Sequence, residues 1–308
     1  TLMARVLRQL GHGEQPHAPG LSVPGWWRRP SRLLGTPAAG RCFELPAGPR
    51  APGDPQPLLI VGDDGPLTHL AVRACEVRGL HYTLNVADLD RDLATIRPWA
   101  VLDTRDREGL AGPRRRRNDG HGARSSVARV CADAGLPCAL FTSAFGPGLA
   151  AEALSLPGLL VARTGPVFVP WDAAAGPAAW LDRLDEGRPV RAEANRRWRG
   201  VYGPDLLDGV LDLLLDGAAG GFDFIPREAL GEAQLARELA AVADGDPALV
   251  SEHRTAGHGP VDVHHGVSYA PPTETTLERF VRERRLARSE GERAVHRRED
   301  DVRLEQAH

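Results

Sequence analysis

A turn rich in glycine is the first segment of the sequence whose residues could bind a ligand. Gly62, Gly65 and Thr68 follow one another at intervals of three residues, directly after the apolar run 58–61. Between a strand and a helix, glycines let the backbone approach a pyrophosphate, and the helix N-terminus offers free N–H groups with a partial positive charge. The spacing therefore predicts a dinucleotide-binding turn, and a turn that binds no ligand is the alternative.

Two features of the same turn favour that alternative. Asp63 and Asp64 place carboxylates where a diphosphate would lie, and like charges at close range in a partly dry site cost on the order of a few kcal/mol. Thr68 stands where the GxxGxxG pattern has its third glycine, so the pattern is incomplete.

The sequence restricts the proton chemistry that the chain can perform. It contains no lysine, because all 38 residues counted as Lys or Arg are arginine. A Tyr–Lys pair, in which the ammonium group lowers the pKa of the phenol, is therefore excluded for Tyr82, Tyr202 and Tyr269. Thr142 and Ser143 end an apolar run and could donate a hydrogen bond, but no nucleophile elbow surrounds them.

The remaining polar groups predict neither a metal site nor a charged partner. Four histidines near the C-terminus show no HxxxH spacing on a helix and have no cysteine beside them, which favours a solvated loop over a zinc site. They are His253, His258, His264 and His265. The net charge of -3 gives no reason to expect nucleic acid or a membrane as partner. Four widely spaced cysteines without a CxxC pair predict reduced thiols in a cytoplasmic protein.

The elements that must position these residues alternate between apolar runs and helical patterns. Strands are expected at 58–61, 82–84, 99–102, 138–141 and 159–162. Helices are expected at 67–78, 125–134, 205–216 and 230–242. This alternation predicts an α/β fold with a Rossmann-like parallel sheet flanked by helices, and with Gly62 at the C-terminal end of the first strand.

The composition divides the chain into three parts. Residues 1–56 are rich in Pro, Gly and Arg and predict an irregular N-terminal arm or linker, anchored on the domain by Trp26 or Trp27. Residues 57–284 form the expected domain, and residues 285–308 a charged tail, either a solvated helix or a frayed end.

Short segments spread over most of the domain resemble the dTDP-4-dehydrorhamnose reductase family, which is a sugar-nucleotide branch of the extended short-chain dehydrogenases. No single segment is decisive, but their order and their placement at strand ends are specific. They are residues 97–102, 117–120, 141–143, 161–164, 168–171, 187–190, 201–206 and 221–224.

The resemblance implies an oxidoreductase of dTDP-rhamnose biosynthesis that uses NADP or NAD to reduce a dTDP-4-keto sugar. It implies a nucleotide-binding core at about 57–171 and 200–219, and a small C-terminal substrate lobe at about 172–199 and 220–284. The residues that it assigns to the cofactor are Gly62, Gly65, Thr68 and Asn118. Those that it assigns to the sugar nucleotide are Arg163, Trp171 and Tyr202, and the catalytic remnant is Thr142 and Ser143.

The sequence departs from the family at the residues that perform its chemistry. The Tyr-x-x-x-Lys pair is absent, so we expect a weak or inactive reductase, a pseudoenzyme. The alternative is a non-catalytic binding or scaffold module, attached to a glycoside-hydrolase-like domain. Residues 24–30 resemble the junction of such fused proteins, and the start at Thr1 rather than Met predicts that the chain is a piece of a longer polypeptide.

Overall fold

The computed structural model describes about two thirds of the chain. The described residues are 41–42, 56–62, 65–85, 89–105, 122–144, 155–171, 176–194, 196–226, 230–254 and 268–306. The expected anchors Trp26 and Trp27 and the expected cofactor residue Asn118 lie outside these residues.

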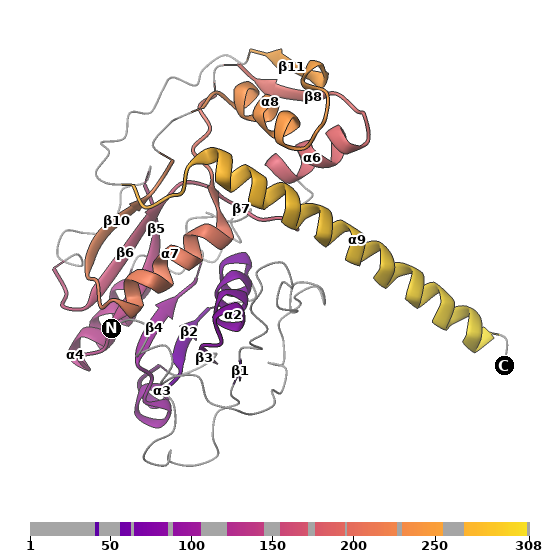
Figure 1. The fold of residues 1–308 in the computed structure, drawn as a ribbon. Coiled ribbons are helices and arrows are strands. Elements are labelled where there is room, and N and C mark those ends of the chain that lie inside the picture. The colour runs from indigo at the N-terminus through magenta and orange to yellow at the C-terminus, as the bar shows by residue number, and fades with distance from the viewer. Residues whose placement is uncertain are drawn as a thin grey trace.

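One parallel sheet forms the centre of the described structure (Figure 1). Its seven strands lie in the order β1-β3-β2-β4-β5-β6-β10, and every neighbouring pair is parallel. Their bounds are β1 Arg41–Cys42, β2 Leu58–Val61, β3 His81–Asn85, β4 Ala100–Asp103, β5 Cys138–Ser143, β6 Leu159–Thr164 and β10 Gly220–Phe224. The predicted Rossmann-like parallel sheet is thereby confirmed, with Gly62 directly after β2.

Both faces of the sheet are buried under helices, which explains why the strand sequences are apolar without alternation. α2 (Pro66–Arg78) and α7 (Gly203–Leu215) share one apolar core with one face. α3 (Leu89–Ile96) and α4 (Gly122–Asp133) share a second core with the opposite face. The order β3-β2-β4 places a topological switch point at β2, and ligands of open α/β sheets bind at such points, outside the C-terminal ends of the strands.

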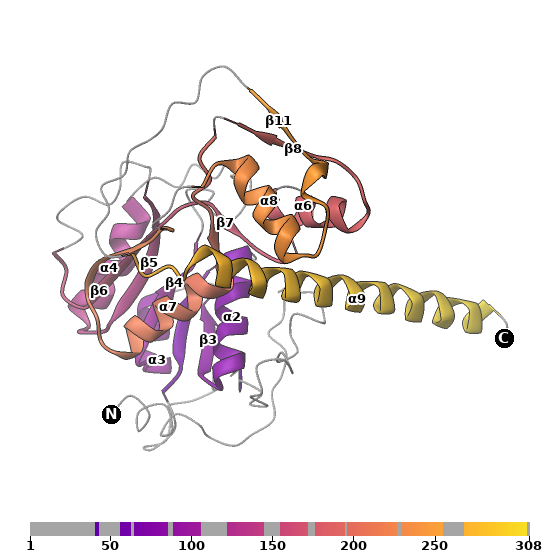
Figure 2. The same ribbon diagram turned by 45° about the horizontal axis from the view of Figure 1, so that its top comes forward.

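A smaller lobe with its own apolar core packs beside the sheet (Figure 2). It consists of α6 Gly176–Asp185, β8 Val190–Glu193, α8 Glu232–Val242, the 3-10 turn Pro247–Leu249 and β11 Val250–His253. β8 and β11 pair in parallel, and the short strands β7 (Val167–Phe168) and β9 (Val201–Tyr202) pair where the chain leaves and re-enters the core. The long helix α9 (Thr273–Gln306) begins between the lobe and α7 and extends away from both (Figures 1 and 2).

Three expected boundaries differ from the structure. Within the expected arm, residues 41–42 form β1, which pairs with β3 in the main sheet. Residues 220–224, which were assigned to the lobe, form the edge strand β10 beside β6. The expected tail 285–308 is helical as far as Gln306, because α9 continues through residue 285 without interruption. No helix of the described residues is long and apolar enough to cross a membrane.

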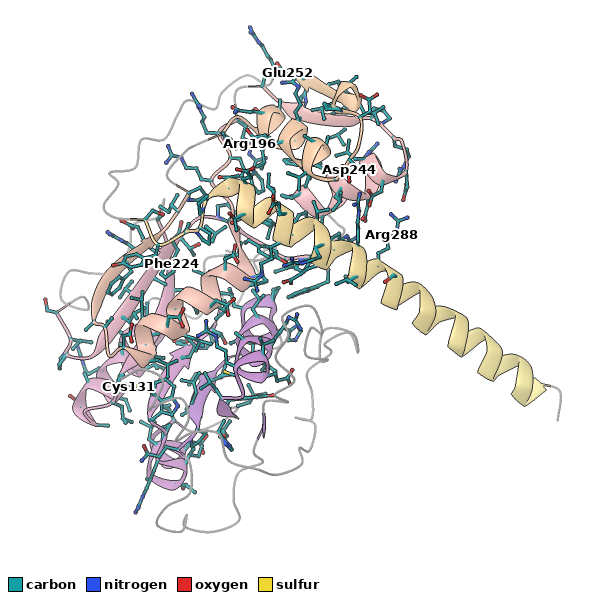
Figure 3. The ribbon with its side chains drawn as sticks, in the orientation of Figure 1. Cys131, Arg196, Phe224, Asp244, Glu252 and Arg288 are labelled. Carbon is teal, nitrogen blue, oxygen red and sulfur yellow. The ribbon has the colours of Figure 1, made fainter. Side chains whose placement is uncertain are left out.

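A glycine in the middle of α7 allows this helix to pack closely on β10. A Cβ atom at Gly209 would lie 2.6 Å from Cε1 of Phe224, whose ring is buried between the helix and the sheet (Figure 3). We expect Gly209→Ala to lower the free energy of unfolding by about 1 kcal/mol or more. Overpacking costs about 1–3 kcal/mol, which exceeds the gain of up to about 1 kcal/mol in helix propensity.

Chemical denaturation measures this change. The control is Gly209→Ala combined with Phe224→Leu, in which the smaller side chain makes room, so the further loss caused by the alanine should shrink. A Gly209→Ala protein as stable as the original would show that the ring moves without cost.

Candidate functional site

The turn after β2 presents backbone N–H groups at the C-terminal edge of the sheet. α2 begins with Gly65 as its N-cap and Pro66 in its first turn, and no side chain caps it. No acidic residue lies in that first turn. Helix N-terminal amides of this kind are a favourable place for an anionic group. Asp63 and Asp64 lie outside the described residues.

Two threonine hydroxyls fill the space beside Gly62. Oγ1 of Thr68 and Oγ1 of Thr104 are 2.7 Å apart and form a buried hydrogen bond. A Cβ atom on Gly62 would lie 2.2 Å from the Thr104 oxygen and 2.3 Å from the Thr68 oxygen. Glycine is therefore required here by the packing of β2 against α2 and the end of β4. Thr104 was not predicted as part of this turn.

A buried carboxylate with its own arginine ends β4, next to the same turn. The Arg105 guanidinium donates to Asp103 over 2.7 and 2.5 Å, and the Arg105 backbone N–H donates to the same carboxylate over 3.2 Å. Asp103 is only 3% exposed, so this local pair compensates a charge that would be costly to bury alone. Asp103 was not among the predicted site residues.

The expected catalytic remnant and one expected substrate residue lie together at the ends of β5 and β6. Thr142 pairs with Arg163 and Ser143 with Thr164 across the two strands. Thr142 is buried, and Ser143 is half-buried. Arg163 binds Asp223 of β10 through two contacts of 2.8 and 2.9 Å. A substrate carboxylate or phosphate would therefore have to share this guanidinium with Asp223.

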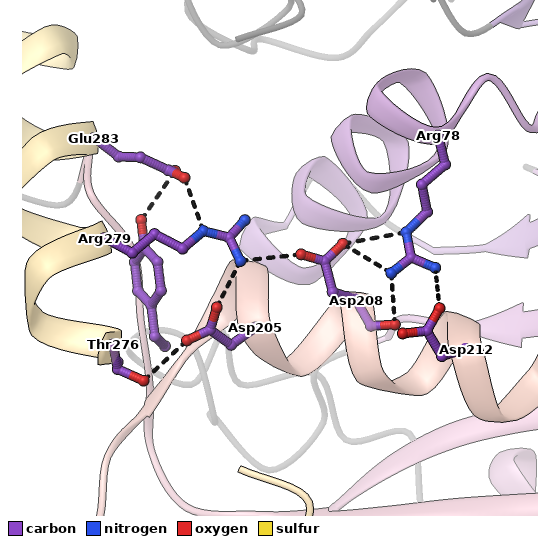
Figure 4. Close-up of polar contacts among 8 residues, drawn as sticks. Arg78, Asp205, Asp208, Asp212, Thr276, Arg279 and Glu283 are labelled. Atoms are coloured by element: carbon purple, nitrogen blue, oxygen red, sulfur yellow. Dashed lines mark hydrogen bonds and ion pairs between the residues drawn. The ribbon is translucent and has the colours of Figure 1, made fainter. Parts of the chain in front are cut away.

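Tyr202 lies in the apolar contact between the lobe and α9 rather than at the strand ends. Its ring packs against Phe168 and Phe280, with ring centroids 5.3 and 5.7 Å away. Its hydroxyl donates to Glu283 over 3.0 Å, and Arg279 binds the same glutamate (Figure 4). Burial, and then the negative charge of Glu283, raises the pKa of Tyr202 well above its usual value. A phenol in this state is a poor proton donor to a substrate.

A small cavity of about 30 Å³ lies between the core and the lobe. Phe168, Trp198 and Tyr202 line it with aromatic surface, and Asp205 and Thr276 are polar groups at its wall. Ligand pockets are commonly apolar with a few polar groups. The Asp205 carboxylate already accepts from Thr276 over 3.0 Å. The expected substrate residue Trp171 is half-buried and packs against the apolar core that contains residues of α2 and α7.

The described residues contain no group of three or more His, Cys, Asp or Glu that could hold a metal ion. Of the four histidines considered in the sequence, His253 ends β11, and His258, His264 and His265 lie outside the described residues.

Substitution of Gly62 tests the packing of the turn. Gly62→Ala places a methyl group against two hydroxyl oxygens, and we expect it to lower the free energy of unfolding by about 1–3 kcal/mol. Gly221→Ala is the matched control, because the nearest side-chain atoms to its Cβ are 3.8 Å away. Denaturant unfolding of both proteins measures the difference, and equal stabilities would contradict the close packing.

Substitution of Tyr202 tests its role in the structure. Tyr202→Phe keeps the ring but removes the hydrogen bond to a buried carboxylate, so we expect a loss of about 1.5–3 kcal/mol of stability. Phe168→Leu serves as a comparison that changes the same aromatic cluster without touching Glu283. An unchanged unfolding midpoint for Tyr202→Phe would show that Glu283 does not depend on the phenol.

The chain is similar to known proteins in its fold but not in its sequence. No protein-family model matches the sequence, and no curated protein matches it. Among solved structures, the dTDP-4-dehydrorhamnose reductase of Bacillus anthracis in complex with NADP is similar, with a TM-score of 0.55 at 13% identity, over 74% of this chain and 99% of that chain. The UDP-N-acetylglucosamine 4-epimerase of Bacillus cereus gives a TM-score of 0.54 at 13% identity, over 74% of this chain and 99% of that chain.

A dTDP-4-dehydrorhamnose reductase from Clostridium acetobutylicum gives a TM-score of 0.50 at 10% identity, over 73% of this chain and 98% of that chain. Identities this low establish a common architecture and leave the activity open. The chain therefore has the fold of dTDP-4-dehydrorhamnose reductases and of a sugar-nucleotide epimerase.

Proposed function

We propose that this chain is a nucleotide-binding or sugar-nucleotide-binding protein of the dTDP-4-dehydrorhamnose reductase type that has little or no reductase activity. The observation that carries the proposal is the absence of lysine from all 308 residues, in a chain whose fold is that of NADP-linked reductases. The binding part rests on the fold, and the loss of activity rests on the missing catalytic pair.

The turn after β2 fits a dinucleotide in part. The uncapped amides of α2 beside Gly65 suit a phosphate of NADP or NAD, and Thr68 and Asn118 complete the proposed cofactor set. The glycine at 62 does not strengthen the case, because two threonine hydroxyls fill the space beside it. When bound, the dinucleotide would supply hydride; the residues of this turn would only bind and orient it.

Hydride addition to a keto sugar also needs a proton at the developing alkoxide. Thr142 and Ser143 are hydroxyls that can donate a hydrogen bond but are not acidic enough to replace an activated phenol. Tyr202 is bound to Glu283 in an apolar cluster, and no lysine exists to lower its pKa. A positioned acid typically contributes about 10²–10⁴-fold to a rate, and this contribution is what the chain lacks.

The dTDP-sugar is the proposed ligand of the surfaces around Arg163, Trp171 and Tyr202. The cavity lined by Phe168 and Trp198 lies between the core and the lobe, and ligand sites often occur between two such bodies. At about 30 Å³ it would have to widen to hold a sugar. The proposed division of the chain is an arm, a core, a lobe and a tail. Residues 41–42 and 220–224 belong to the core in this division, because they form strands of the main sheet. A cytoplasmic location is supported by the described cysteines at 75, 131 and 138, which are buried and not joined in disulfides.

A scaffold role beside a fused or partner glycoside-hydrolase-like domain is the second candidate. The closed threonine pair at the cofactor turn favours it, because a protein that binds no dinucleotide needs no open crevice there. The two candidates differ in a property that can be measured directly, namely the affinity of the purified chain for nucleotides.

Calorimetric titration with NADPH, NADH and a dTDP-sugar, followed by an assay with dTDP-4-dehydrorhamnose, tests the proposal. We expect binding of at least one nucleotide and NADPH oxidation far below about 1 s⁻¹, the lower end of ordinary enzyme rates. A dTDP-4-dehydrorhamnose reductase with an intact Tyr–Lys pair is the positive control. Turnover at about 1 s⁻¹ or faster would refute the loss of activity, and no binding of any nucleotide would favour the scaffold.

A further inference from the structure

The first turns of α9 contact the core and the lobe through different arginines. Arg279 points toward α7 of the core (Figure 4), whereas Arg284 and Arg285 reach the lobe. Because these residues lie on one rigid helix within two turns of each other, α9 connects the core with the lobe in addition to the crossing segments of the chain.

The core side of this contact is a network of buried charges. Arg279 binds Asp205 over 2.6 Å and Asp208 over 3.1 Å on α7, and Glu283 over 3.0 Å on its own helix. Asp208 also binds Arg78 of α2 over 3.2 Å (Figure 4). The side chains of Asp205 and Glu283 are only 7% and 6% exposed. The network therefore fixes α9 directly on α7 and links it to α2 only through Asp208.

Charge balance makes Arg279 the centre of the network. Burial alone would lower the pKa of Arg279, but Glu283, Asp205 and Asp208 outweigh burial and raise it. Burial raises the pKa of Asp205, although Arg279 and Thr276 oppose that shift. Without the guanidinium, the buried side chains of Asp205 and Glu283 would lose their ion pair, and an unpaired charge in this position would be costly.

The lobe side begins one turn further along α9. Nε and Nη2 of Arg284 donate to the two oxygens of Asp182 on α6, and Nη1 donates to the Pro170 carbonyl over 2.7 Å. Pro170 lies where the chain leaves the core for the lobe, so Arg284 holds this crossing as well as the lobe itself. Nη2 of Arg285 donates to Asp185 of α6 over 2.9 Å and to the Ala243 carbonyl after α8 over 2.6 Å.

We propose that α9 is a strap whose arginines hold the lobe and the core in one fixed arrangement. Arg279 fastens it to the core and Arg284 to the lobe and to the crossing at Pro170. Apolar contacts of Leu277 and Phe280 with the lobe core add affinity, while the directional guanidinium contacts determine the relative orientation. With the strap in place, the two bodies behave as one cooperative unit, and the pocket between them keeps its shape.

Amide hydrogen exchange on the full chain tests the strap at the crossing segments. Two reporters are the Trp198 amide, which donates to the Leu230 carbonyl, and the Val201 amide, which donates to the Pro166 carbonyl. Arg284→Met should raise exchange there by about tenfold or more, while β2 and β5 stay within about twofold of the original protein. Thermal unfolding should separate into two transitions, because the two bodies are no longer coupled.

Arg282→Met is the matched control, since Arg282 is an exposed arginine of the same helix that makes no hydrogen bond or ion pair with the described residues. It should leave exchange and the single transition unchanged. Arg279→Met, which breaks the core side, should reproduce the effect of Arg284→Met. If Arg284→Met does not fold, Arg284→Lys takes its place in the exchange experiment. It should also raise exchange at the crossing segments, because lysine keeps the charge but loses the planar fork.

Two results would overturn the strap. One is unchanged exchange at Trp198 and Val201 in the arginine variants. The other is an equal increase of exchange throughout β2, β5 and the crossing segments, with a single transition at lower temperature, which would show that α9 contributes only to global stability. Neither result depends on nucleotide binding, so the proposed function can fail while the strap holds.

Discussion

The burial of Arg279 among Asp205, Asp208 and Glu283 is the interaction on which the arrangement of the two bodies depends. Asp205 and Asp208 lie on α7 and Glu283 lies on α9 itself, so the guanidinium reaches all three only while the two helices lie close together. Breaking a fully buried pair costs about 3–5 kcal/mol, and the cost here is smaller because the Arg279 and Asp208 side chains are 22% and 32% exposed. The Tyr202 hydroxyl donates a hydrogen bond to Glu283 of the same network. This bond explains why Tyr202 has a structural role and is not available as a proton donor.

The main sheet was predictable because its signal is local. Leu58–Val61 and Leu159–Thr164 are apolar along almost their whole length, as expected for strands covered on both faces. The edge strand β10 gave no such signal, because its sequence Gly-Gly-Phe-Asp-Phe has two residues without side chains and only two apolar ones. The start of α9 was missed for another reason: its charged residues find their partners about 70 residues away on α7, and the sequence shows them only as solvated charges.

The candidate site also contains some features that the sequence predicted and others that it did not. The glycine spacing predicted the turn after β2, and the hydroxyls at the end of β5 were placed correctly on a strand end. The hydrogen bond between Thr68 and Thr104 spans 36 residues, and the bond between Tyr202 and Glu283 spans 81. Such pairs arise from the tertiary fold, so neither the closed space beside Gly62 nor the burial of Tyr202 could be derived from local patterns.

Gly62 shows why a glycine pattern can remain in a chain that has lost the catalytic pair. A Cβ atom there would collide with two threonine hydroxyls whether or not a dinucleotide is present. The requirement for glycine is therefore imposed by the contact of β2 with α2 and with the residue after β4, and it holds as long as the fold does. A fold does not imply one chemistry, and packing alone can require a residue that a ligand would also require. In this chain the lysine that chemistry needs is absent, whereas the glycine that packing needs is present.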